Sequence, residues 1–266
     1  MPAPASWSTD ELRRFVEDGV LIRRGLVHGA TLARARALVD RWLNEAYNPE
    51  RLIAYTERSF SPELEEHPVL LDLYQSTGLA ELAAELLWPA TAAPVARAQI
   101  QIRLPDSAAQ PVKAMHVDGV SCPHLESRDL RTFSFIVGVV LDGSATADAG
   151  ALHYVPGGHR RMAGYFATDW VRGQPAQTPE DIDDLDGTAL VAEPGDVIVM
   201  HHLVPHRVGI NTSGTPRVMV YFRVSHAQHP DLALEALSDP WLEFPALSAL
   251  AGPQIAKGEH HGRPRS

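Results

Sequence analysis

Cysteine is the scarcest residue type in this chain of 266 residues, which contains only Cys122. A single thiol excludes a disulfide within the chain. Apolar runs of the roughly 20 residues that a membrane-spanning helix needs are also missing. Basic side chains are outnumbered, since 23 Lys and Arg stand against 33 Asp and Glu, which gives a net charge of −10. This excess speaks against nucleic acid or an anionic membrane as a partner, so a small molecule is the expected ligand.

Signals for export are missing as well. The N-terminus has no positively charged region followed by an apolar core, as a secretory signal would have. The lone cysteine also suits a reducing compartment. We therefore expect a cytoplasmic protein, and the sequence leaves its oligomeric state open.

Residues 8–88 have the apolar spacing of helices. A capping box at Ser8 begins the first helix, and Gly19 is placed to end it. Further helices are predicted over 31–47 and, as a pair broken near a glycine, over 68–88. These helices are expected to form a jacket that packs on a sheet.

Residues 95–225 consist of short β-rich segments separated by proline and glycine. The strands predicted here are 98–104, 132–141, 151–155, 189–191, 197–200 and 218–224. Short strands at such spacing favour a mainly β fold with flanking helices, a double-stranded β-helix of the jelly-roll, cupin-like kind. The sequence contains no internal repeat and no long polar linker. We therefore expect residues 1–257 to form one domain and residues 258–266 to be a disordered tail.

His116 and Asp118 form the most informative short motif. Successive side chains of an extended strand point to opposite faces, so these two would point the same way. An imidazole and a carboxylate on one face can hold one metal ion. Two histidines and one carboxylate on one side of an iron ion leave the opposite positions open for dioxygen and a co-substrate. A second histidine must then come from elsewhere in the chain.

Three histidines compete for that position: His201, His202 and His206. The first two continue the strand over 197–200, so we expect one to face the core and the other to face solvent. His206 follows Pro205, where the strand opens into a loop. We therefore favour His206 as the third ligand.

Arg217 begins the strand that follows turn-forming residues at 211–214, and a hairpin there would set it beside His206. Its planar guanidinium can bind a carboxylate through two parallel hydrogen bonds and stays charged in apolar surroundings. A dicarboxylate that binds the metal at one end could meet Arg217 at the other. This is the geometry expected for 2-oxoglutarate.

Four ordered motifs resemble the phytanoyl-CoA dioxygenase family of iron(II)- and 2-oxoglutarate-dependent oxygenases. They are His116-Val117-Asp118, the stretch 150–160, Pro194-Gly195-Asp196, and His206 with Arg217. The resemblance covers about residues 95–225. It implies an enzyme that uses Fe(II), 2-oxoglutarate and dioxygen to hydroxylate, or otherwise oxidise, an unactivated C–H bond of a small molecule, with release of succinate and carbon dioxide. The Ala-, Arg- and Pro-rich composition favours a bacterial enzyme of secondary or specialised metabolism.

The resemblance also implies roles for particular residues. The implied iron ligands are His116, Asp118 and His206. Arg217 would pair with the distal carboxylate of 2-oxoglutarate. Gln99 matches a position where relatives contact the co-substrate, although Gln101 and Arg103 share its expected face.

Two positions depart from the family pattern, and a third position, which agrees with the pattern, bears on the type of reaction. Relatives often carry a hydroxyl where this chain has Val208 and a bulky aromatic about where it has Gly138, so the pocket is expected to differ in shape. Halogenating relatives replace the metal-binding carboxylate with a small residue. Because Asp118 is kept, we expect hydroxylation or a related oxidation.

Two other classes of protein would use the same residues differently. A non-catalytic metal-binding jelly roll would keep the ligands without productive 2-oxoglutarate binding, and the presence of Arg217 speaks against it. A zinc hydrolase would need a nearby general base and no dicarboxylate site. In the oxygenase, the long connections 119–131 and 157–188 are expected to act as lids that set substrate specificity.

Overall fold

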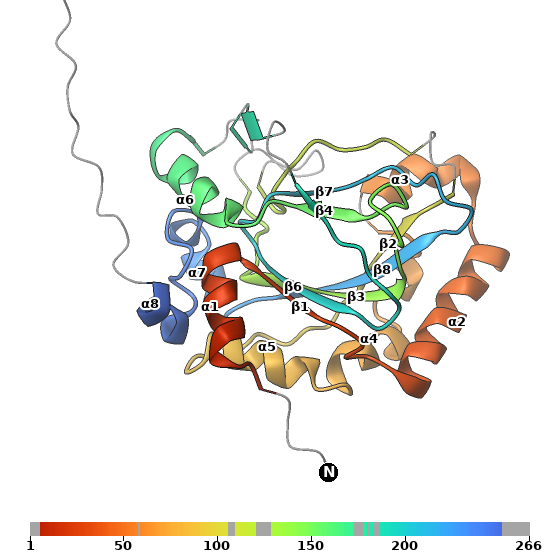
Figure 1. Cartoon of the computed structure of the whole chain (residues 1–266), viewed down its shortest axis with the longest axis horizontal. Helices are drawn as coiled ribbons and strands as arrows, with labels where there is room; N and C mark the ends of the chain where they lie inside the picture. Colours follow the sequence, from red (N-terminus) through yellow and green to blue (C-terminus); the bar gives the residue numbers. More distant parts are fainter. Residues whose placement is uncertain are drawn as a thin grey trace, which may run out of the picture.

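Two antiparallel sheets form the centre of the protein, whose computed structural model describes residues 6–57, 59–105, 110–120, 129–172, 178–179, 181–182 and 187–251. The strands are β1 (Val20–Arg23), β2 (Gln99–Arg103), β3 (Phe135–Asp142), β4 (Leu152–Tyr154), β5 (Thr188–Ala189), β6 (Val197–His201), β7 (His206–Val208) and β8 (Arg217–Val224). The larger sheet has the order β1-β6-β3-β8-β2, and the smaller sheet has the order β5-β4-β7. Figure 1 shows the two sheets facing each other, and the predicted mainly β architecture with flanking helices is confirmed.

The three central strands of the larger sheet, β6, β3 and β8, are buried on both faces. Side chains alternate along a strand, so Val220 and Phe222 of β8 pack toward the helices. Met219 and Tyr221 of the same strand pack instead among residues of the smaller sheet, such as Leu152. This double burial explains why these strands are nearly continuous apolar runs in the sequence.

Helices cover the face of the larger sheet that points away from the smaller sheet. The protein as a whole contains the helices α1 (Thr9–Asp18), α2 (Gly29–Glu45), α3 (Leu52–Glu57), α4 (Pro68–Gln75), α5 (Leu79–Leu87), α6 (Gly158–Thr168), α7 (His229–Leu232) and α8 (Pro245–Ala251), with short 3₁₀ turns η1 (Pro49–Arg51), η2 (Pro62–Leu64) and η5 (Glu235–Leu237). Figure 1 shows α2, α4 and α5 on this side, where they bury one large apolar core against the sheet. None of the helices in the described ranges is both long and apolar enough to cross a membrane.

The predicted start and end of the first helix are confirmed. The backbone N–H of Glu11 donates to the hydroxyl of Ser8, and the Glu11 carboxylate accepts the Ser8 N–H at 2.8 Å. Gly19 ends the helix with a φ of 74°, a backbone conformation that glycine adopts without strain. The predicted break between α4 and α5 is also present, at Gly78, whose φ is 85°.

The expected hairpin between the strands that carry His206 and Arg217 is wrong. Strand β7 pairs with β4 in the smaller sheet, whereas β8 pairs with β2 and β3 in the larger sheet. The connection between them crosses from one sheet to the other. Asn211 holds this crossing in place, since its side-chain N–H groups donate to the carbonyls of Arg103 at 2.9 Å and Thr215 at 2.8 Å.

The expectation that His201 or His202 faces solvent is also wrong, because both are buried. The C-terminal segment covers this end of β6. The imidazole Nε2–H of His201 donates to the Pro240 carbonyl at 2.7 Å, and the rings of Trp241 and Phe244 pack against His201. Both histidines are therefore part of the core.

The segment predicted as a lid over 157–188 contains a helix. Gly157, with a φ of 72°, caps the N-terminus of α6, and this helix buries Met162 and Phe166. Residues 173–177, 180 and 183–186 of this segment lie outside the described residues, as do 121–128 of the other predicted lid and the predicted tail at 258–266.

Candidate metal centre

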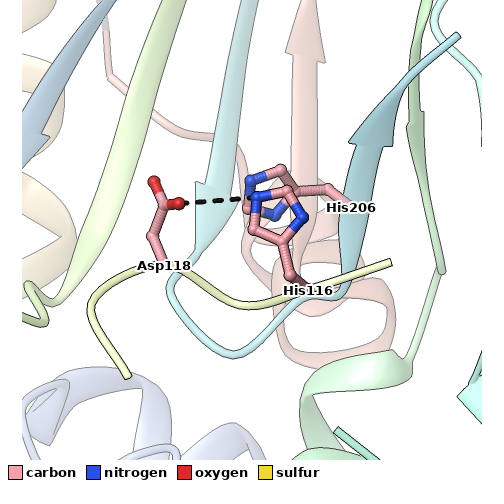
Figure 2. Close-up of side chains that lie close together, drawn as sticks. All are labelled: His116, Asp118 and His206. Carbon is pink, nitrogen blue, oxygen red and sulfur yellow. Dashed lines mark ion pairs between the residues drawn. The ribbon is translucent and has the colours of Figure 1, made fainter. Parts of the chain in front are cut away.

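A backbone bridge brings His116 and His206 together. The N–H of His116 donates to the carbonyl of His206 at 3.1 Å, and the reverse bond is 3.0 Å long. The two rings therefore lie side by side, with centroids 4.7 Å apart. The chain turns at Asp118 directly after the bridge, so the motif is not the extended strand that the sequence predicts. Figure 2 shows that the three side chains nevertheless converge.

The three side chains can each offer one ligand atom to a common metal ion. These atoms all lie within 4.8 Å of one another, and His116 Nε2 is 3.7 Å from Asp118 Oδ1. Donor atoms that share one metal ion are roughly 3–4 Å apart, given bonds of about 2.0–2.2 Å. The site is thus close to the spacing that a metal requires.

Backbone carbonyls fix which nitrogen of each imidazole carries the proton. His116 Nδ1 lies 3.0 Å from the carbonyl oxygen of Ala114, and His206 Nδ1 lies 3.0 Å from that of Val204. A carbonyl can only accept, so each Nδ1 carries the proton and donates it. The lone pair of each Nε2 is then available to bind a metal. Metal-binding histidines typically donate their other ring N–H to a carbonyl in this way.

Charge within the cluster keeps the carboxylate ionised and one imidazole neutral. Burial by itself would raise the pKa of Asp118, but Arg223, followed by His206 and His116, lowers it well below its usual range. Burial lowers the pKa of His206 to about 4, and the neighbouring His116 contributes to this. At neutral pH, Asp118 and His206 are therefore in the protonation states that metal ligands need.

Arg223 is a functional residue that the sequence reasoning missed. Its Nη2 donates to Asp118 Oδ2 at 3.1 Å, and its guanidinium lies over the ring of Phe133 at 5.3 Å. Because Oδ2 is held in this way, Oδ1 is the oxygen directed at the histidines. A signal was available, since Arg223 lies an even number of positions after Arg217 on the same strand and must share its face.

Arg217 is buried in the space between the two sheets with only 2% of its surface exposed. Within the part of the chain that the structure describes, neither Nη1 nor Nη2 has an acceptor at good hydrogen-bond geometry, although the Tyr221 hydroxyl lies close enough to interact with the guanidinium. Arg103, directly opposite on β2, is different, because its Nη1 and Nη2 donate to the carbonyls of Pro111 at 3.1 Å and Gln110 at 3.0 Å. A buried cation without acceptors is costly, so Arg217 fits a site that receives an anionic ligand.

Gln99 lies on the inner face of β2, directly across from Tyr221 of β8. Gln101 and Arg103 share this face, as expected, whereas Ile100 points to the helices. Gln99 is thus separated along the strand from the Arg103–Arg217 pair by Gln101. The structure brings all three inner side chains of β2 to the space between the sheets.

Comparisons with known proteins agree with this architecture. The family model "Phytanoyl-CoA dioxygenase (PhyH)" matches residues 15–219. The chain is similar to EctD from S. alaskensis, solved with 2-oxoglutarate and 5-hydroxyectoine, with a TM-score of 0.62, 17% identity and coverage of 85% of this chain and 78% of that one. The chain has no match among curated proteins.

Two further solved structures are similar over most of their length. HygX from Streptomyces hygroscopicus, with nickel and 2-oxoglutarate bound, has a TM-score of 0.57 and 15% identity over 84% of this chain and 88% of that one. The non-heme alpha ketoglutarate dependent carbocyclase SnoK from nogalamycin biosynthesis has a TM-score of 0.57 and 17% identity over 85% of this chain and 90% of that one. The predicted jelly roll is confirmed by these likenesses.

Proposed function

Since the chain belongs to the phytanoyl-CoA dioxygenase family of iron(II)- and 2-oxoglutarate-dependent oxygenases, we propose that it oxidises an unactivated C–H bond of a small molecule. One observation carries this proposal: a cluster of three metal-ligand side chains shares the space between the sheets with a buried guanidinium that has no acceptor in the described ranges. The three ligand side chains suit a metal ion. The buried guanidinium suits the far carboxylate of a dicarboxylate that is bound to this metal at its other end.

In this proposal His116, Asp118 and His206 hold the iron. The donor set fits, because two imidazole nitrogens and one carboxylate on one side of iron(II) leave positions for a co-substrate and dioxygen. Bound iron would supply the activation of dioxygen that is coupled to the conversion of 2-oxoglutarate to succinate and carbon dioxide. The chain itself supplies the orientation of the ligands, through the carbonyls behind each imidazole and Arg223 behind Asp118.

Arg217 would hold the distal carboxylate of 2-oxoglutarate. Its two terminal nitrogens are buried and lack acceptors among the described residues, and a carboxylate can accept from both at once. Because Arg217 lies in the apolar interior between the sheets, this pairing would be shielded from water and correspondingly strong. Gln99, on the same inner face, is proposed as a further contact of the co-substrate.

The primary substrate is proposed to be a small molecule of bacterial specialised metabolism that is oxidised in the cytoplasm. Two neighbours support this setting, since one is a carbocyclase from nogalamycin biosynthesis and another was solved with 5-hydroxyectoine. Hydroxylation is favoured over halogenation because Asp118 occupies the position that a halide would need.

An anaerobic titration tests the proposal. Apo-protein is loaded with iron(II) and then titrated with 2-oxoglutarate while the weak visible charge-transfer band of the chelate is followed. The band should appear and saturate, and aerobic incubation with substrate pools should then release succinate. Folded, iron-loaded protein without the band would contradict the proposal and favour a metal-binding module or a zinc hydrolase.

A further inference from the structure

Tyr221 lies on β8 between the two arginines of the site. Arg217, Tyr221 and Arg223 are separated by even numbers of residues, so they point to the same inner face of the strand. Tyr221 is 6% exposed and packs among the apolar residues between the sheets. Along the strand Tyr221 thus lies between the buried guanidinium of Arg217 and Arg223, which contacts Asp118 of the metal cluster.

The ring of Tyr221 occupies the space above Gly138. These two residues are direct partners across β3 and β8. A Cβ atom added at Gly138 would lie 2.7 Å from Tyr221 Cε1 and 2.9 Å from Ile198 Cγ2, closer than such atoms approach. The absence of a side chain at Gly138 thus lets the Tyr221 ring lie on the inner surface of the larger sheet.

The hydroxyl of Tyr221 has a poor hydrogen-bond partner. It donates to Met219 Sδ at 3.2 Å, and a thioether is only a weak acceptor. Burial raises the pKa of Tyr221, and the positive charge of Arg217 together with its contact to the hydroxyl offsets this only in part, so the hydroxyl remains protonated at neutral pH. The protonated hydroxyl has only a weak acceptor, and the guanidinium has none at good geometry in the described ranges. Together they form a set of donors that suits an anion.

We propose that Tyr221 binds the co-substrate: its O–H donates to the distal carboxylate held by Arg217, and its ring, seated over Gly138, forms the floor between the two ends of the site. This inference rests on the proposed function. A carboxylate has enough lone pairs to accept from both residues at once. The binding of 2-oxoglutarate would then move the hydroxyl from the sulfur to a charged acceptor.

The test compares two ligands in iron(II)-loaded protein without oxygen. One is 2-oxoglutarate, and the other is 2-oxopentanoate, which keeps the metal-chelating 2-oxo acid and has a methyl group in place of the distal carboxylate. In Tyr221→Phe the affinity for 2-oxoglutarate should fall about 10- to 100-fold, as expected for loss of one hydrogen bond to a charged group. The affinity for 2-oxopentanoate should stay within about twofold of wild type, because the hydroxyl does not contact the chelating end. Iron(II) affinity should not change.

Tyr154→Phe is the matched control. Tyr154 is a buried tyrosine of the same apolar cluster, but its hydroxyl is influenced by Asp18 and Arg24 rather than by Arg217. Its loss should leave the affinities for both ligands unchanged. Gly138→Ala, which displaces the Tyr221 ring and keeps its hydroxyl, answers the same question if Tyr221→Phe does not fold, and it should also weaken 2-oxoglutarate binding.

The outcomes separate this inference from the proposed function. A charge-transfer band in wild type with equal 2-oxoglutarate affinity in Tyr221→Phe would overturn the role of Tyr221 and leave the oxygenase proposal standing. An equal loss for both ligands would also overturn it, because the hydroxyl would then act elsewhere than on the distal carboxylate. Absence of the band in wild type would overturn both.

Discussion

Replacing Arg217 with methionine should make the ligand-free protein more stable and its binding of 2-oxoglutarate weaker. Both terminal nitrogens of the guanidinium are buried and lack acceptors in the described ranges. An unsatisfied buried polar group costs about 1–3 kcal/mol, and a charged one costs more. Methionine has a similar length and no polar group to bury, so the free energy of unfolding of the ligand-free protein should rise by about 1–3 kcal/mol.

The same substitution removes the partner of the distal carboxylate. Loss of one member of a buried, hydrogen-bonded charge pair costs about 2–5 kcal/mol, which corresponds to about 30- to 4,000-fold in affinity. Iron(II) affinity should stay as in wild type, because the charge partner of the metal cluster is Arg223 on Asp118 and not Arg217. Stability and co-substrate affinity are therefore expected to change in opposite directions.

Urea unfolding of metal-free protein measures the first effect, and the anaerobic charge-transfer titration measures the second. Arg103→Met is the matched control, since Arg103 is the buried cross-strand neighbour whose guanidinium donates to the carbonyls of Gln110 and Pro111. Its loss leaves those carbonyls unpaired and should lower the free energy of unfolding by about 1–3 kcal/mol. An equal loss of stability in Arg217→Met would refute the reasoning, because Arg217 would then have acceptors in the ligand-free protein.

Three further changes are expected to have measurable effects. His116→Ala should abolish both succinate release and the visible band, and full activity would remove His116 from the iron site. Arg223→Ala should shift the acid limb of iron(II) binding to higher pH, because Asp118 loses the cation that lowers its pKa; identical pH profiles in metal titrations would contradict this. Acid should destabilise the fold below about pH 6.5, because burial lowers the pKa of His201 to about 4 and that of His159 to about 2, so that the unfolded chain binds more protons. The loss is about 1.4 kcal/mol per pH unit for each histidine, and a flat denaturant midpoint between pH 7 and 5 would argue against it.

Features that depend on near neighbours in the chain were predicted from the sequence. The capping box at Ser8 and the helix end at Gly19 each involve residues within one helical turn of the boundary. The strands 197–200 and 218–224 were found within a residue of their bounds, because apolar runs between turn residues are a local signal. The family motifs likewise identified which histidines and which carboxylate would meet.

Features that depend on distant segments were not predicted. His201 and His202 are buried because Pro240 and Ala236 of a later segment contact them, and no local pattern indicates where a later segment will pack. The sheet assignment of β7 was wrong for a similar reason, since the partners of His206 are Tyr154 and His116, far back in the chain. Turn chemistry at Asn211 was recognised, but a turn between two sheets and a hairpin turn use the same residue types.

Strand β8 links the stability of the fold to the geometry of the site. Val220 and Phe222 bury one face of this strand against the helices, and Arg217, Tyr221 and Arg223 use the other. A slip of one residue in register would move every side chain to the opposite face and would place two arginines in the apolar core. The apolar face therefore fixes the register, and the register in turn fixes where Arg223 meets Asp118 and where Tyr221 and Arg217 would meet the proposed co-substrate. A single-residue insertion in β8 should for this reason abolish folding and metal binding together, whereas loss of the charge at Arg217 should keep both and weaken only the binding of the co-substrate.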